Sequence, residues 1–296
     1  MLELLRRREA DAHEGPAYDP AADAVYFATA RHERGAPAPG PLVSLLRWDL
    51  RTDAVDVYRE DARVANGLVL ARDGSALLVC EQGDRERPGV VARYDLRGEG
   101  REVLAADYEG QRFNSPNKVL ELADGALVFT DPDYGVRQGF RPPSPLGRGV
   151  YLRRVDGTVA RFGVDLLQPH GLALSPDGNL LYVSDTAADD GTGGFYPECP
   201  HHVWRYRLDA ERAELTDGTR LVASPSGIPD GMACDEGGRL YCATGDGIRV
   251  YDGADGRELH HAPVEGGAVG LCYHADSRRL FATTDDALLI YQSTGA

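Results

Sequence analysis

Hydrophobic and polar residues alternate along this chain in short runs, and one arrangement of runs recurs six times. Each repeat starts at a register position, which is followed by an apolar strand, a tight turn and a second apolar strand. The strands are rich in Val, Ile, Leu, Tyr and Phe, and Asp-Gly, Pro-Asp-Gly or Gly-Gly turns between them supply φ > 0 at low cost. The register positions are Glu14, Asn66, Asn117, His170, Asp230 and Val269.

The spacing of these positions indicates the architecture. Successive register positions are 52, 51, 53, 60 and 39 residues apart, which is long enough for a four-stranded antiparallel unit at each step. Residues 67–71, 76–80, 90–96 and 101–106 illustrate the four strands of the second unit. Helical periodicity is not convincing over any full window. The sequence therefore predicts an all-β fold, a six-bladed β-propeller forming a single domain over residues 1–296.

The sixth unit is one strand short. It contains three strand-like segments, at 270–274, 279–284 and 288–292, and no fourth one follows. Residues Leu2 to Arg8 precede the first repeat. We expect this N-terminal strand to complete the last blade, because pairing it there closes the ring without an exposed sheet edge.

Charge and composition narrow the range of partners. The net charge of −15, from 32 basic and 47 acidic residues, argues against nucleic acid or an anionic membrane surface as a partner. The N-terminus lacks the apolar core of a signal peptide, and the chain has no run of 18 apolar residues, so a soluble cytoplasmic protein is predicted. The five cysteines lack CxxC spacing and are interpreted as reduced thiols of the core.

The register positions also collect polar side chains. In a propeller the first strand of each blade lines the central channel, so Glu14, Asn117, His170 and Asp230 should form a ring at one mouth. Two carboxylates in a confined pocket need a neutralising cation or proton, and a divalent metal would serve. Each Asn or Asp before Gly is by itself more typical of an ordinary turn, and it is the presence of four donors on one register that favours a metal site. Asn66 shares the register and is either a ligand, a turn residue or a donor that orients a ligand.

Several motifs at these positions resemble a known family. The stretch from Arg112 to Asn117 with DGALVFTDPDYG at 124–135 is similar to the signature of the SMP-30/gluconolactonase/LRE-like proteins. Similar matches occur at His13–Pro16, at 65–83, at 169–185 and at 228–232, so the similarity covers essentially the whole chain. The resemblance implies a six-bladed propeller with one divalent metal, Ca²⁺ by analogy, in the channel. It also implies hydrolysis of lactones, often sugar lactones.

Carried over residue by residue, Glu14, Asn117 and Asp230 match metal-site positions of that family. Two departures affect the chemistry. His170 stands where Asn is common, and Lys118 stands where Asp is usual. Imidazole is a poor ligand for Ca²⁺ and a better one for Zn²⁺, Fe²⁺ or Mn²⁺. His170 is therefore predicted either to bind the metal or to act as a general acid or base.

The mechanism that fits is metal-dependent opening of a lactone ring by attack of an activated water, with Asp230 as the candidate base. Arg112, Asn114 and Asn66 are predicted to bind substrate hydroxyls. Tyr134 and the inserted loop 187–201 are expected to shape the rim, and the Gly and Asp content of the loop suggests a mobile lid. The predicted partner is a small-molecule lactone.

Two other functions are compatible with the same pattern. A cation in a channel also suits a phosphotriesterase-like hydrolase, and propellers often serve as non-catalytic ligand-binding scaffolds with a structural metal. Other chemistries find no motif: the chain has no GxSxG elbow, no P-loop and no GxGxxG opening a helix.

Overall fold

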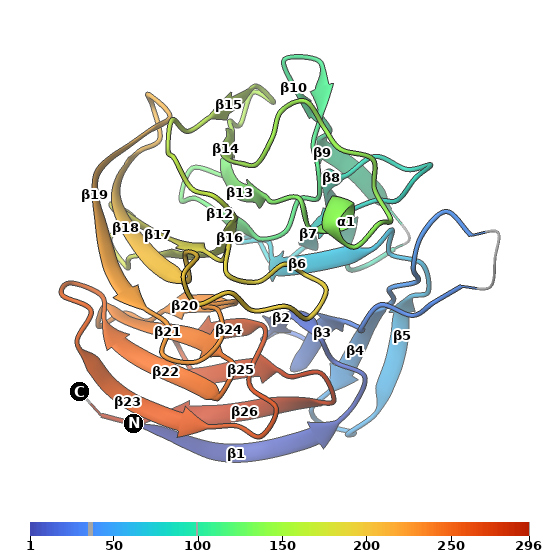
Figure 1. Ribbon diagram of the computed structural model, residues 1–296. Coiled ribbons are helices and arrows are strands. Elements are labelled where there is room, and N and C mark those ends of the chain that lie inside the picture. Colours follow the sequence, from blue (N-terminus) through green and yellow to red (C-terminus); the bar gives the residue numbers. More distant parts are fainter. Residues whose placement is uncertain (35–37, 99, 296) are drawn as a thin grey trace.

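The predicted six-bladed propeller is confirmed by the computed structural model, which describes residues 1–34, 38–98 and 100–295. Six four-stranded antiparallel sheets surround a central channel, and the first strand of each repeat is the innermost (Figure 1). No helix in the described part of the chain has the length and apolarity needed to cross a bilayer.

The blades follow one another in chain order. Blade 1 comprises β2 (Glu14–Asp19), β3 (Ala24–Ala28), β4 (Leu45–Asp49) and β5 (Val55–Arg59). Blade 2 comprises β6 (Ala65–Leu70), β7 (Ala76–Glu81), β8 (Val90–Asp95) and β9 (Arg101–Ala105). Blade 3 comprises β12 (Val119–Glu121), β13 (Leu127–Asp131), β14 (Gly149–Arg153) and β15 (Val159–Arg161). Blade 4 comprises β16 (Pro169–Leu174), β17 (Leu180–Asp185), β18 (His202–Asp209) and β19 (Glu214–Ala223). Blade 5 comprises β20 (Met232–Cys234), β21 (Arg239–Thr244), β22 (Gly247–Asp252) and β23 (Glu258–Pro263). Blade 6 comprises β24 (Leu271–His274), β25 (Arg279–Thr283), β26 (Ala287–Ser293) and β1 (Leu2–Glu9). The chain also forms a small hairpin of β10 (Asp107–Tyr108) and β11 (Gln111–Arg112), and the one-turn helix α1 (Tyr134–Arg137).

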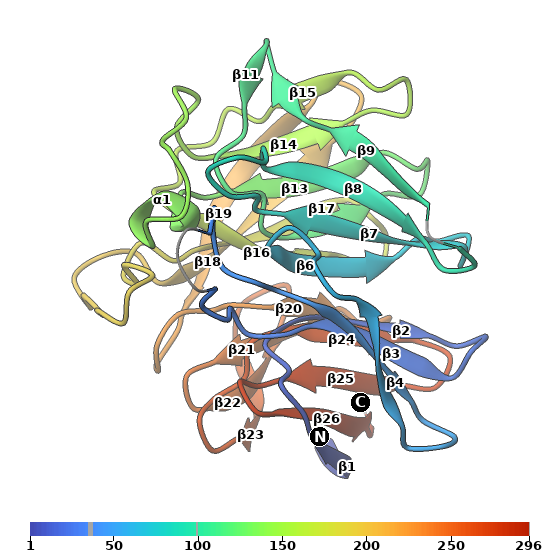
Figure 2. The same cartoon turned by 90° about the vertical axis from the view of Figure 1, so that its right-hand side faces the viewer.

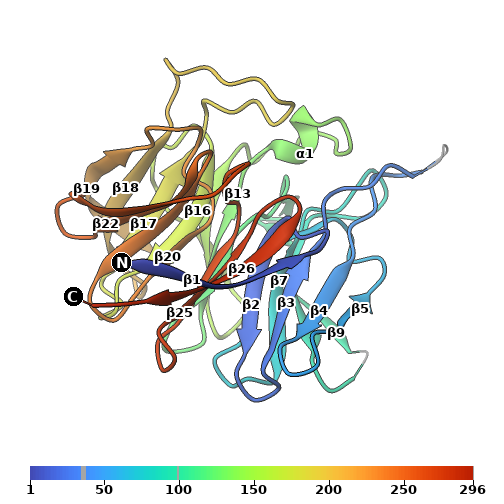
Figure 3. The same ribbon diagram turned by 90° about the horizontal axis from the view of Figure 1, so that it is seen from below.

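The N-terminal strand completes blade 6, as expected. β1 pairs antiparallel with β26, from Leu2 opposite Ser293 to Glu9 opposite Ala287, and both termini lie at this blade (Figures 1 and 3). The guanidinium of Arg6 in β1 lies 4.6 Å from the ring centre of Trp48 in blade 1. One strand therefore closes blade 6 and also fastens it to the first blade.

The core lies between the blades. Six clusters of buried apolar side chains each join two neighbouring blades. Strand β7 shows why: Leu77 and Val79 pack against blade 1, whereas Leu78 and Cys80 pack against blade 3. Successive side chains of a strand point to opposite faces of the sheet, so a strand such as β7, whose blade packs between two others, must be apolar on both faces. All five cysteines are free.

A glycine follows the register position in five of the six repeats, and the packing of the ring explains it. Each of these glycines faces the start of the next inner strand; a Cβ on Gly171, for example, would lie 2.1 Å from the backbone oxygen of Asp230. Gly67 and Gly231 are equally close to the blade that follows, at 2.4 and 2.5 Å. Only a residue without a side chain lets adjacent inner strands approach this closely.

We expect Gly171→Ala to lower the melting temperature by roughly 3–10 °C, since an added methyl in a close-packed site costs about 1–3 kcal/mol. Gly163→Ala is the matched control, because a Cβ at Gly163 meets no atom within 4 Å. Thermal unfolding of both variants would check the prediction. Equal melting temperatures would contradict the proposed close approach of blades 4 and 5.

Candidate metal centre

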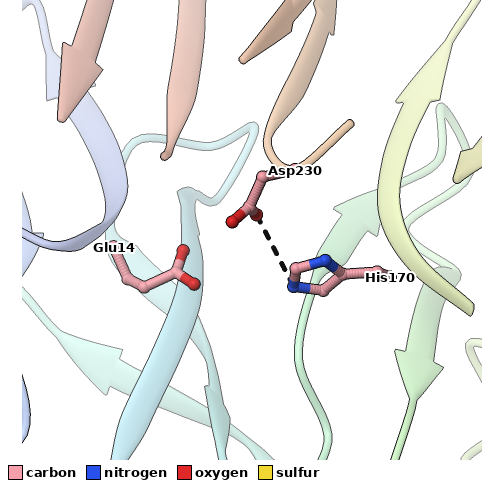
Figure 4. Close-up of side chains that lie close together, drawn as sticks. All are labelled: Glu14, His170 and Asp230. Atoms are coloured by element: carbon pink, nitrogen blue, oxygen red, sulfur yellow. Dashed lines mark ion pairs between the residues drawn. The ribbon is translucent and has the colours of Figure 1, made fainter. Parts of the chain in front are cut away.

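Three side chains from different blades converge at one mouth of the channel. Glu14 begins β2, His170 lies at the start of β16, and Asp230 comes two residues before β20. One potential ligand atom from each lies within 4.8 Å of the other two. The His170 Nε2 atom is 3.5 Å from Asp230 Oδ1, and the Glu14 carboxylate points towards both side chains (Figure 4). The shared register thus brings together residues far apart in sequence.

A fourth charged group enters the cluster. The ammonium of Lys118 donates a hydrogen bond to the Glu14 carboxylate and lies 3.1 Å from Asp230 Oδ1. Only 11% of the Lys118 side chain is exposed. Burial by itself lowers the pKa of Lys118, but the carboxylates of Asp230 and Glu14 outweigh it and hold that pKa above its usual value. The two carboxylates are therefore paired with an internal cation.

The two asparagines on the register have unsatisfied oxygens. Asn66 and Asn117 are 5% and 1% exposed, and neither Oδ1 atom has a hydrogen-bond partner within the described residues. Leaving a buried acceptor unpaired costs roughly 1–3 kcal/mol. A divalent cation would accept lone pairs from such oxygens as well as from carboxylates and imidazole. The donor set therefore fits a divalent ion.

The His170 imidazole is neutral at physiological pH. Burial, reinforced by the positive charge of Lys118, lowers the pKa of His170 to about 3. The ring packs edge-on against Tyr134, with ring centres 5.1 Å apart. A neutral imidazole has a free lone pair that can accept either a metal or a proton.

Two aspartates hold the segments that lead into the site. Asp131, at the end of β13, accepts backbone N–H bonds from Asn114 and Ser115 at 2.8 and 2.7 Å, just before Asn117. Asp185, at the end of β17, does the same for the two residues that precede Pro169, at 2.9 Å each. These carboxylates hold the backbone just before Asn117 and His170. Full burial raises the pKa of Asp131 to about 7 despite its N–H bonds.

Helix α1, which begins with Tyr134, and the inserted loop 187–201 lie on one side of the propeller. Helix α1 and the loop 187–201 project together in Figures 2 and 3. The Arg137 guanidinium and the Gln138 amide donate hydrogen bonds to the carbonyls of Asp189 and Gly191, at 3.1 and 2.8 Å. The Tyr134 hydroxyl lies 2.8 Å from Thr186 Oγ1. The helix and the loop therefore form one connected wall next to His170.

Arg112 and Asn114 are not brought into the cluster. The Asn114 amide donates to the Gly147 carbonyl at 2.5 Å and accepts from the Ser144 N–H at 3.0 Å, so its side chain holds the 144–147 loop in place. Arg112 lies exposed in the β10–β11 hairpin. Within the described chain, no hydrogen bond or ion pair joins either residue to Glu14, His170 or Asp230.

The comparisons with known proteins decide the family. Residues 13–286 match the model of the SMP-30/gluconolactonase/LRE-like region. The chain belongs to this family. A family member from Zymomonas mobilis, a gluconolactonase, is 30% identical over 198 residues, which are 63% of this chain and 51% of that protein. The chain thus spans about half the length of this curated relative.

Other family members match more evenly. The pentonolactonase XacC of Haloferax volcanii is 29% identical over 250 residues, covering 83% of this chain and 71% of that protein. The solved structure of a gluconolactonase from Xanthomonas campestris superposes with a TM-score of 0.76 at 30% identity, over 95% of this chain and 86% of that one. Sequence and fold therefore agree on the family assignment.

The family motifs did not point to Lys118 as part of the cluster; they marked it only as a departure. Two signals in the sequence could have done so. Lys118 occupies the position that is glycine in the other five repeats, and it is the only lysine in the chain.

Proposed function

We propose that this protein is a metal-dependent lactonase that opens a lactone ring by hydrolysis. The observation that carries the proposal is the convergence of Glu14, His170 and Asp230 at one mouth of a family propeller. Asn117 is proposed as the fourth ligand because its buried carbonyl oxygen lacks a partner within the described residues. The names of the two curated relatives, a gluconolactonase and a pentonolactonase, favour a sugar lactone as the substrate.

A bound divalent ion would supply Lewis acidity for the lactone carbonyl and make water more acidic at neutral pH. In the proposed reaction Asp230 takes a proton from the attacking water as its oxygen bonds to the carbonyl carbon. The ring C–O bond then breaks, and the proton passes to the ring oxygen, so the product is a hydroxy acid. Asp230 suits the proton transfer because its carboxylate lies inside the cluster, with Oδ1 3.5 Å from His170 Nε2.

Groups around the cluster are proposed to orient the substrate. Asn66 is buried on the same register and offers a carbonyl oxygen to a sugar hydroxyl. Tyr134, packed on His170, and the loop 187–201 would shape the wall of the pocket. Because these groups and the cluster come from several blades, we propose that the ring acts as one functional domain. A mobile lid formed by 187–201 stays a prediction.

The test is a panel of aldonolactones and aromatic lactones assayed by proton release, together with metal analysis of the purified protein. We expect about one divalent ion per chain, and removal of the ion should reduce hydrolysis at least about 100-fold. Re-addition of the metal should restore it.

Full turnover in exhaustively metal-free protein would contradict the metal-dependent mechanism. Hydrolysis of phosphotriesters without lactone hydrolysis would favour the phosphotriesterase-like alternative. Bound metal that raises the melting temperature while no ester is hydrolysed would favour a binding scaffold.

A further inference from the structure

Lys118 is chemically unusual in this chain. All other residues among the 32 basic ones are arginines, so lysine occurs only inside the channel. An ammonium is a compact point charge on a flexible stem, whereas guanidinium is a broad planar fork. The one place where this chain uses the compact cation is between the carboxylates of Glu14 and Asp230.

The shape of the ring lets this side chain reach across the channel. Lys118 follows Asn117 in blade 3, but its partners lie in blade 1 and at the start of blade 5. The Lys118 stem packs beside Gly67, where a Cβ would lie 2.9 Å from Lys118 Cδ. Thr130 Oγ1 accepts the Lys118 backbone N–H at 3.1 Å and donates to the His170 carbonyl at 2.8 Å, which fixes the base of the stem.

Lys118 also borders a second space. A cavity of about 790 Å³ lies beside it, lined along the inner strands by apolar residues such as Leu120 and Leu174 and by polar residues such as Glu121 and Asp177. Glu14, His170 and Asp230 do not line it. Lys118 therefore has free space behind it, into which its charged end can withdraw.

We propose that Lys118 is a tethered cation that competes with the divalent ion for the carboxylates of Glu14 and Asp230. Lys118 thereby sets the affinity of the site for metal and its preference among metals. The inference rests on the proposed metal site, but not on lactone hydrolysis. The ammonium contacts the same Asp230 oxygen that lies 3.5 Å from His170 Nε2. If His170 and that carboxylate oxygen held a metal, the ion would meet the ammonium, which would have to move away.

The charge balance gives the same result. The two carboxylates and the one ammonium together carry a single net negative charge. A site with a smaller net negative charge binds Ca²⁺ more weakly, since Ca²⁺ affinity depends on the number of charged oxygen ligands. The affinity for a metal that binds imidazole well depends less on the net negative charge of the site. Lys118 thus discriminates against Ca²⁺ in the same direction as His170.

The first experiment measures metal binding by calorimetry in wild type, Lys118→Met and Arg212→Met. Methionine keeps an unbranched stem and removes the charge. Arg212 is 75% exposed, so Arg212→Met is a control for the same change in net charge. We expect Lys118→Met to bind Ca²⁺ and Zn²⁺ at least about tenfold more tightly, with the larger gain for Ca²⁺. The Arg212 variant should bind as wild type does.

Metal-free stability gives a second readout. Without the ammonium, two carboxylates face each other unpaired, so metal-free Lys118→Met should melt at a lower temperature than wild type. Saturating metal should then raise its melting temperature by more than it raises that of wild type.

A third measurement needs no variant at all, because protein labelled with ¹³C-lysine shows a single lysine side chain. Titration of the wild-type protein with Zn²⁺ should shift the Lys118 Cε signal, and the shift should be complete at about one equivalent. This keeps the proposal testable even if Lys118→Met fails to fold.

The outcomes are distinct. Unchanged or weaker metal affinity of folded Lys118→Met would overturn the proposal, as would a lysine signal that stays constant while calorimetry records binding. Absence of binding in wild type and variant alike would also overturn it. None of these readouts uses a lactone, so failure of the lactonase proposal would appear separately, as bound metal without ring opening.

Discussion

Asp230→Asn should lower lactone turnover by at least about 100-fold while the protein stays folded. Asparagine keeps the shape and one carbonyl oxygen but cannot take a proton from water. The fold should tolerate the change, because Lys118 remains paired with Glu14 and no charge is left alone. Circular dichroism should therefore match wild type, and the melting temperature should stay within a few degrees.

A matched control lies in the same blade. Asp252 ends β22, and its Oδ1 accepts the Ala254 N–H at 2.9 Å in an exposed turn. Asp252→Asn changes the net charge equally but should leave turnover unchanged. Wild-type turnover in Asp230→Asn would exclude Asp230 as the base and would weaken the proposed site.

Deletion of residues 2–8 should cause the largest loss of stability. Strand β26 would lose six of the seven residue pairs that it forms with β1. Each lost backbone hydrogen bond is worth about 0.5–1.5 kcal/mol, so we expect the melting temperature to fall by more than roughly 10 °C. The exposed edge of β26 should also promote aggregation.

A second variant separates the two contributions of β1. Arg6 donates to the Leu50 carbonyl at 3.0 Å and lies over Trp48, so Arg6→Ala removes these two contacts with blade 1 but keeps the strand. Arg6→Ala should lower the melting temperature by only a fraction of the decrease that the deletion causes. Light scattering and thermal unfolding would measure both effects, and a truncated protein that is monomeric and equally heat-stable would show that β1 is dispensable.

The sequence by itself determined the repeat, the number of blades and the closure of the ring. These features depend on local patterns, because a period of two residues and Asp-Gly turns specify strands and hairpins without reference to distant parts of the chain. The recurrence of such units then requires a closed ring. The shortage of one strand in the sixth unit was sufficient to predict the role of Leu2–Arg8.

The sequence also placed Glu14, His170 and Asp230 at one mouth, since equivalent positions of repeated units must lie at one level. It could not determine which other polar groups join them. Asn114 is three residues from Asn117, yet its amide is used by the 144–147 loop. The direction of a side chain within a loop depends on partners that the local pattern does not specify.

Only the tertiary structure decided the position of the Lys118 ammonium. Lys118 meets Glu14 across 104 residues of sequence, and the stem of Lys118 packs where Gly67 of the neighbouring blade has no side chain. The physical reason is that alternation encodes which face of a strand is buried, whereas a contact across the ring depends on how all six blades pack. The internal cation between the two carboxylates is therefore a property of the assembled ring.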